Sequence, residues 1–216
     1  MKKRIASTLI ALAITLAAFS NSVFADYYSS NTTLYYGMRS SEVVNLQNDL
    51  KSLGYFKYTS TGYFGSSTQQ SVKTFQKDSY LTPDGIAGYC TSEKIKDGKV
   101  LQTAKQYLGV PYVWGGTSPS GFDCSGFTQY VLQKNGISVP RTASLQYNEG
   151  TWVSRNQLEP GDLVFFTTYK AGASHVGIYM GSDQFIEASS GAGQIITADL
   201  SNSYYAQHYI GAKRIV

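Results

Sequence analysis

The sequence predicts an α+β protein in which a small all-helical domain precedes a domain built around an antiparallel sheet. In the first half, Val43, Leu46, Leu50 and Leu53 recur at spacings of three and four, which marks one face of a helix. From residue 162 onward, short runs of β-branched and aromatic residues are separated by turn residues, as is typical of strands. Because the helical patterns come first and the strands follow, antiparallel pairing is expected rather than a βαβ repeat.

The N-terminus has the features of a secretory signal peptide. The chain has 216 residues, of which 42% are hydrophobic, so a globular protein of one or two domains is expected. Residues 2–4 are basic, residues 5–19 are apolar, and Val23-Phe24-Ala25 offers a cleavage site, so residues 1–25 are interpreted as the signal peptide. The alternative is a retained anchor, but the apolar stretch is short for a bilayer span and no second stretch of that length follows. We therefore expect a secreted protein with no membrane span after signal cleavage.

Charge and cysteine content exclude several classes of partner. Without the three basic residues of the signal peptide, 15 Lys and Arg face 14 Asp and Glu, which leaves no concentrated basic surface for nucleic acid. Two His and two Cys in unrelated contexts do not supply four metal ligands, so neither a metal nor another cofactor is expected. A disulfide between Cys90 and Cys124 is the alternative use of the cysteines, although their surroundings argue against it. A monomer is expected.

Residues 26–33 form a polar lead-in, and residues 34–96 have the pattern of a small helical unit. Ser40 or Ser41 can cap the first helix, and Gly54 can end it in the left-handed conformation. The unit contains a series of short motifs in a characteristic order: Leu46-Gln47, Leu53-Gly54-Tyr55, Gly62-Tyr63-Phe64-Gly65, Phe75-Gln76 and Asp84-Gly85-Ile86-Ala87-Gly88. With these motifs the unit resembles the small three-helix peptidoglycan-binding domains, which implies attachment to bacterial cell wall. The alternative is a structural spacer.

Residues 97–99 are short and polar and are interpreted as a linker, so that the second domain spans residues 100–216. Its predicted helices are an opening helix that ends at Gly109 and a second one from Ser125 to about Lys134. The predicted strands cover 162–167, 175–180, 184–188, 194–198 and 209–216.

Cys124 lies between a glycine-rich loop and a helical pattern, which places its sulfur at a helix N-terminus. A helix end contributes about 0.3–1 kcal/mol, usually less than one pKa unit, so a dominant thiolate needs a neighbouring imidazolium. His175 heads an apolar strand, whereas His208 lies among tyrosines near the C-terminus. His175 is the better candidate, because its strand can fold against the helix of Cys124. Glu187, on the next predicted strand, can orient the imidazole if the two strands form a hairpin; the alternative is a solvated strand residue.

The second domain contains five motifs that occur together: Pro111-Tyr112-Val113-Trp114-Gly115-Gly116, Phe122-Asp123-Cys124-Ser125-Gly126-Phe127, Pro140-Arg141-Thr142, Pro160-Gly161-Asp162-Leu163-Val164-Phe165-Phe166 and Ser174-His175-Val176-Gly177-Ile178-Tyr179. With them, residues 100–216 resemble the NlpC-type cell-wall cysteine peptidases, which have a compact papain-like fold. The resemblance implies Cys124 as nucleophile and His175 as general base and then general acid. The third family position, usually His, falls on Glu187.

The same resemblance implies a substrate and a set of binding residues. Family members typically cut peptidoglycan stem peptides between D-γ-glutamate and the following diamino acid. Tyr112 is expected to direct its hydroxyl toward the sulfur, Asp123 and Ser125 to contact substrate, and Arg141 to bind a stem-peptide carboxylate, with a surface role as the alternative for Arg141. We therefore expect a secreted, wall-associated hydrolase of peptidoglycan. The alternatives are an N-acetylmuramoyl-L-alanine amidase and a non-catalytic wall-binding scaffold, which the unusual Glu187 keeps open.

Overall fold

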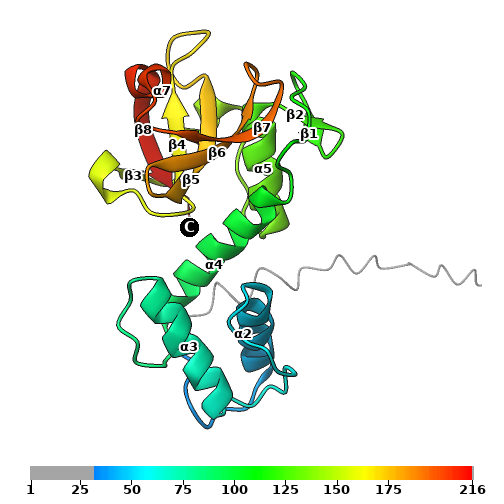
Figure 1. Cartoon of the computed structure of the whole chain (residues 1–216), viewed down its shortest axis with the longest axis vertical. Coiled ribbons are helices and arrows are strands. Elements are labelled where there is room, and N and C mark those ends of the chain that lie inside the picture. Colours follow the sequence, from blue (N-terminus) through cyan, green and yellow to red (C-terminus); the bar gives the residue numbers. More distant parts are fainter. Residues whose placement is uncertain (1–31, 216) are drawn as a thin grey trace, which may run out of the picture.

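The computed structural model describes residues 32–215, so the predicted signal peptide and residues 26–31 of the lead-in lie outside the described part of the chain. The first domain consists of α2 (Ser41–Ser52), α3 (Ser66–Asp78) and the first half of α4 (Tyr89–Lys105), which pack around one apolar core (Figure 1). The N–H of Val43 donates to the Ser40 hydroxyl at 3.3 Å, and Gly54 follows α2 with φ +87°. The predicted cap and end of this helix are therefore confirmed.

Helix α4 belongs to both domains and replaces the linker expected at residues 97–99. Its residue Ile95 is buried in the helical core, whereas Val100 and Ala104 are buried in the core of the sheet domain. Gly98 weakens a helix by about 1 kcal/mol relative to Ala. A Cβ at this position would lie 3.3 Å from the Leu53 side chain, so the missing side chain lets α2 and α4 pack closely. Tertiary packing thus keeps helical a segment that composition alone marks as a break.

Ion pairs strengthen the junction between the two domains. Lys99 pairs with Asp49 of α2 at 2.6 Å. Lys94 pairs with Glu159 of the sheet domain at 2.7 Å, and Glu159 also meets Arg214 at 3.0 Å. A continuous helix and these contacts together fix how the helical domain sits beneath the sheet domain in Figure 1.

The second domain is organised around a six-stranded sheet in the order β3-β8-β4-β5-β6-β7, with every neighbouring pair antiparallel. Its strands are β3 (Thr151–Val153), β4 (Leu163–Phe166), β5 (His175–Gly181), β6 (Gln184–Ser189), β7 (Gln194–Asp199) and β8 (Tyr209–Arg214). The predicted α+β class and all five predicted strands are confirmed. The elements that were not predicted are short: β3, the pair β1 (Thr117–Ser118) and β2 (Gly121–Phe122), α6 (Ala143–Gln146), a 3-10 turn (Arg155–Gln157) and α7 (Ser203–His208).

The two faces of the sheet carry separate apolar clusters. Helix α5 (Cys124–Lys134) covers one face, where Phe127 and Val131 pack with Val176 and Ile178. On the other face, Phe166, Phe185 and their neighbours form a second cluster, against which α7 packs. Among the helices of residues 32–215, none has the length and apolarity that crossing a bilayer requires.

Candidate active site

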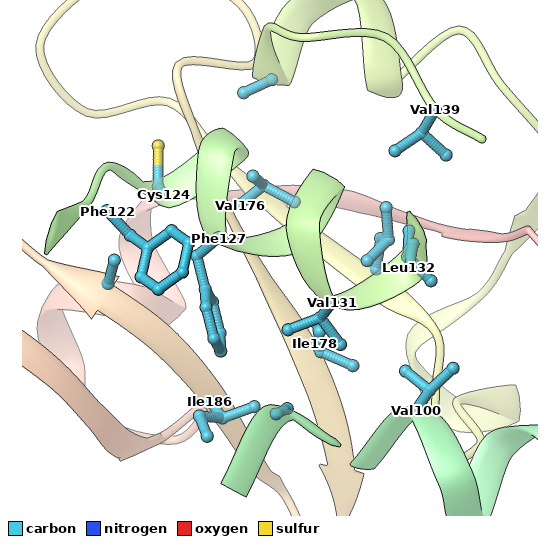
Figure 2. Close-up of a cluster of buried hydrophobic side chains, with 14 of the residues drawn as sticks. Val100, Phe122, Cys124, Phe127, Val131, Leu132, Val139, Val176, Ile178 and Ile186 are labelled. Carbon is cyan, nitrogen blue, oxygen red and sulfur yellow. The ribbon is translucent and has the colours of Figure 1, made fainter. Parts of the chain in front are cut away.

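Cys124 is the first residue of α5, and Asp123 holds the start of this helix in place. The Asp123 carboxylate accepts from the N–H of Gly126 at 2.7 Å and from the N–H of Gly115 at 3.0 Å, so it caps the helix and ties the preceding loop to it. A Cβ at Gly126 would lie 2.1 Å from the carbonyl oxygen of Gly116, so only glycine lets the loop come this close. Figure 2 shows the Cys124 sulfur pointing away from the apolar side chains that α5 buries against the sheet.

The predicted hairpin of β5 and β6 is present and brings His175 and Glu187 together. Ile178 pairs with Ile186, so the register places Glu187 opposite Gly177, diagonal to His175 on the same face of the sheet. The Nε2 atom of His175 lies 2.5 Å from Oε2 of Glu187. Cys124 lies close enough to the ring to raise the pKa of His175, and its sulfur lies 3.9 Å from the carbonyl oxygen of the neighbouring Ser174.

The surroundings of His175 favour the charged imidazolium. Burial lowers its pKa, but the hydrogen bonds and negative charges of Cys124 and Glu187 outweigh burial and raise the pKa of His175 to about 10. The ring is therefore protonated at neutral pH. The other histidine, His208, lies in α7 with its Nδ1 2.6 Å from the Tyr204 carbonyl oxygen, and it makes no contact with this group.

Glu187 is almost fully buried, with 1% of its surface exposed, and its second oxygen has a partner that the sequence analysis missed. The hydroxyl of Tyr205 donates to Oε1 of Glu187. Tyr205 belongs to α7, whose six residues are too few to show a helical period. The available signal was Asn202, which caps α7 by accepting from the Tyr204 N–H at 2.9 Å.

A cavity of about 380 Å³ opens over the sulfur. It is lined by residues from four segments: Tyr112, Trp114, Gly115, Asp123, Cys124, Ser125, Arg141, Thr142, Ala143, Ser144, Tyr169, Lys170, Ala173 and Ser174. All four residues expected to bind substrate are therefore brought to the cavity that holds Cys124. Burial, together with the negative charges of Cys124 and Asp123, raises the pKa of Tyr112 to about 12, so its phenol stays protonated beside the sulfur.

Arg141 is already engaged within the protein. Its guanidinium meets both oxygens of Asp123, at 3.0 Å and 2.5 Å, and also donates to the Ser125 hydroxyl at 3.0 Å. This fork-to-fork pair uses the geometry that was expected to bind a substrate carboxylate. In this structure the planar fork of Arg141 holds the helix start, and its side chain still borders the cavity. Trp114 and Tyr169, which also line the cavity, are exposed and meet edge to face, with ring centroids 5.4 Å apart.

The two cysteines differ in surroundings and are both free. Cys90 is exposed in the first turn of α4, and Cys124 is buried at the base of the cavity. In the described range 32–215, no three His, Cys, Asp or Glu side chains converge in the way that a metal site requires.

Comparison with known proteins matches both domains to families. Residues 109–214 match the NlpC/P60 family, and residues 39–95 match the putative peptidoglycan binding domain. The chain is 50% identical over 119 residues to a probable peptidoglycan endopeptidase LytE of Bacillus subtilis, covering 54% of this chain and 34% of the relative. It is 40% identical over 165 residues to a gamma-DL-glutamyl hydrolase of the same species, covering 73% of this chain and 40% of the relative. The chain thus spans between a third and two fifths of these relatives.

Among solved structures, an NlpC/P60 family protein from Bacillus cereus aligns with a TM-score of 0.52 at 36% identity, over 55% of this chain and 40% of that one. The antiparallel sheet, the cysteine at the start of α5 and the histidine at the head of β5 give the second domain the architecture of the cysteine peptidase class. More specifically, the chain belongs to the NlpC/P60 family through residues 109–214, and it carries a peptidoglycan-binding domain in front of them.

Proposed function

We propose that this protein is a secreted endopeptidase that cleaves the amide bond between D-γ-glutamate and the diamino acid of peptidoglycan stem peptides. The observation that carries the proposal is that Cys124, at the base of an open cavity, lies beside the start of β5, where His175 is bonded to Glu187. The relative named gamma-DL-glutamyl hydrolase supports the choice of bond, because its similarity extends over both domains of this chain. The peptidoglycan-binding domain supports wall association.

In this mechanism the resting site is a thiolate–imidazolium pair. The raised pKa of His175 means that the ring holds its proton at neutral pH, so the sulfur attacks the carbonyl carbon without a separate deprotonation step. The new C–S bond pushes the carbonyl electrons onto oxygen. As the intermediate collapses, the C–N bond breaks and His175 gives its proton to the departing amine. The general-base role expected for His175 therefore falls in the second half of the reaction, when the neutral ring activates water against the thioester.

Two groups are placed to stabilise the developing oxyanion. As the first residue of α5, Cys124 has its N–H in the turn where no helical carbonyl is available to accept it. The Tyr112 phenol, whose raised pKa keeps it protonated, borders the same cavity and is a hydroxyl donor. The pair Asp123–Arg141 acts indirectly, by fixing the start of the helix that carries the nucleophile.

The deciding experiment digests purified cell wall with the full chain and identifies the fragments by mass spectrometry. The expected product carries a new N-terminal diamino acid. Release of a muramic acid with a free lactyl carboxylate would instead establish the amidase. Cys124→Ala is expected to abolish turbidity loss. No loss from either protein would establish the non-catalytic scaffold, and equal loss from both would exclude Cys124 as the nucleophile. Secretion is tested by N-terminal sequencing of the exported protein, which is expected to begin at Asp26.

A further inference from the structure

The carboxylate of Glu187 is a buried charge whose two oxygens each need a partner. It lies on the sheet face opposite α5, beside the rings of Phe166 and Phe185. Aromatic surroundings do not solvate an anion, so a carboxylate here is stable only if hydrogen-bond donors replace water. His175 satisfies Oε2, which leaves Oε1 dependent on the Tyr205 hydroxyl.

Packing against two aromatic rings holds Tyr205 in position to donate to Glu187. Its ring meets Phe166 and Phe185 edge to face, with centroid separations of 5.3 Å and 4.9 Å. Burial together with the neighbouring Glu187 raises the pKa of Tyr205 against a weaker opposing influence of Ser189, so the phenol donates its proton and does not lose it. Three elements thus carry one chain of hydrogen bonds, from Tyr205 of α7 through Glu187 of β6 to His175 of β5.

We propose that Tyr205 is a positioning residue of the active site, which keeps Glu187 ionised and aimed at Nε2 of His175 so that the imidazolium and the thiolate persist together. This inference rests on the proposed function of Cys124 and His175. It also explains how glutamate serves at a position where the resembling family usually has histidine: a buried neutral imidazole needs no second donor, whereas a buried carboxylate does. Tyr205 does not border the cavity, so it acts through Glu187 and not on substrate.

Titratable groups from several neighbouring elements surround the carboxylate of Glu187. Beside Glu187 lie His175 of β5 and Tyr205 of α7, and Tyr204 adds a weaker influence on Tyr205. Cys124 of α5 completes the set through His175. If Tyr205 no longer donates, Oε1 of Glu187 is left buried without its donor, and the carboxylate supports the imidazolium of His175 less well, so activity is lost at a higher pH on the acidic side.

The test compares Tyr205→Phe with Tyr209→Phe in the full chain. Tyr209 is the matched control because its ring also packs on Phe166, while its buried hydroxyl finds no hydrogen-bond partner among residues 32–215. Tyr205→Phe is expected to lower kcat about tenfold, the equivalent of one charge-assisted hydrogen bond, with KM within twofold. The acidic limb of its pH profile is expected to move up by about half to one unit. Tyr209→Phe is expected to leave kcat, KM and the acidic limb unchanged.

A second readout needs no substrate. In a Cys90→Ser background, only Cys124 can react with iodoacetamide, and the rate of alkylation against pH reports the thiolate directly. The same upward shift is expected in Tyr205→Phe, with a smaller one in Ser189→Ala. In a Glu187→Gln background, Tyr205→Phe is expected to have no further effect, because the two residues act in series.

The proposal is overturned if Tyr205→Phe matches the unsubstituted protein in both profiles, if Tyr209→Phe causes the same losses, or if the effects of Tyr205→Phe and Glu187→Gln simply add. Failure of the proposed function would look different. Wall cleavage would then survive Cys124→Ala, while the alkylation profile of Tyr205→Phe would still decide whether Tyr205 supports the His175–Cys124 pair.

Discussion

Each domain buries a long polar side chain at its centre, and the two kinds of side chain serve opposite purposes. In the helical domain, Gln76 is 2% exposed, and its amide donates to Asp84 at 2.8 Å and to the Ile86 carbonyl at 2.9 Å while accepting from the Gly85 N–H at 2.9 Å. In the sheet domain, Glu187 is equally buried but carries a charge directed at His175. A neutral amide with donors and acceptors on one group ties loops together, whereas a carboxylate, which only accepts, polarises its partner.

The same contrast explains what the sequence motifs of each domain represent. Gln47 repeats the behaviour of Gln76: it accepts from the Gly62 N–H at 3.0 Å and donates to Thr68 at 2.8 Å and to the Tyr63 carbonyl at 2.9 Å. The motif residues of the helical domain thus hold its loops and helices together. The motifs alone do not identify which residues contact cell wall. The motifs of the sheet domain contain the reactive side chains. Resemblance therefore gives more chemical detail for the second domain than for the first.

Replacement of the buried charge is expected to have the largest effect. Glu187→Gln keeps the size of the side chain but removes the charge that favours imidazolium, so kcat/KM is expected to fall about 100- to 1,000-fold. The loss should appear in kcat, measured on soluble muropeptides. Glu149→Gln, the same substitution at an exposed residue, is the control and is expected to be neutral. A Glu187→Gln enzyme within threefold of the original would show that the carboxylate only fills space.

Replacement of the buried amide of Gln76 is expected to lower stability and to leave catalysis almost unchanged. Gln76→Ala leaves the Gly85 N–H and the Ile86 carbonyl without their partner, which is expected to lower the free energy of unfolding by about 2–4 kcal/mol. Cleavage of soluble muropeptides should stay within twofold at a temperature where the variant is folded. Denaturant titration measures the stability, and Gln70→Ala on the exposed face of α3 is the control. A large loss of kcat would mean that the helical domain shapes the active site.

Local patterns predicted most of the fold, and the exceptions share a physical cause. Strands β4 to β8 and helices α2 and α5 each carry enough residues to show their period, and they were predicted to within a few residues. Strand β3 has three residues and α7 has six, so neither shows a period. Contacts distant in sequence hold them, such as the pairing of Val153 with Ala212 of β8. The linker expected at 97–99 is helical because packing against Leu53 outweighs the low helix propensity of Gly98.

In the candidate site, too, the residues set by local sequence could be predicted, and the contacts between distant segments could not. Cys124, His175 and Glu187 could be predicted because a helix start, a strand head and a hairpin register are all local features. The role of Tyr205 was not predicted, since it depends on how α7 folds back over the sheet. For the same reason, nothing local in the sequence shows that the guanidinium of Arg141 is paired with Asp123.

Asp97 lies in α4 at the junction between the two domains, and its replacement is expected to change stability less than Gln76→Ala does. Burial raises the pKa of Asp97 to about 6, against the opposing influence of Lys94. Because its folded pKa exceeds the ordinary value of 3.8, the folded state binds the proton more tightly, and stability falls as pH rises from about 4 through 6. Asp97→Asn cannot ionise, so it is expected to remove this fall and to gain at most about 3 kcal/mol at pH 7.

The measurement for Asp97 is the melting temperature of the full chain between pH 4 and pH 8. Asp199→Asn, at the exposed end of β7, is expected to follow the unsubstituted protein throughout. If Asp97→Asn is less stable at pH 7, the ion pair with Lys94 outweighs burial, and the junction depends on charge rather than packing.

The smallest effect is expected from the second cysteine. Cys90 is exposed in the first turn of α4, outside the three apolar clusters and far along the chain from the reactive cysteine. Since serine replaces one small exposed side chain by another, Cys90→Ser is expected to change stability by less than about 0.5 kcal/mol and to leave wall cleavage intact. Thermal unfolding and turbidity loss under reducing and oxidising conditions test this together. Equal stability and equal wall cleavage of Cys90→Ser and the unsubstituted protein in both conditions would show that only the sulfur beside His175 matters. If an oxidant inactivates the unsubstituted protein but not the variant, Cys90 has a role that its exposed position does not predict.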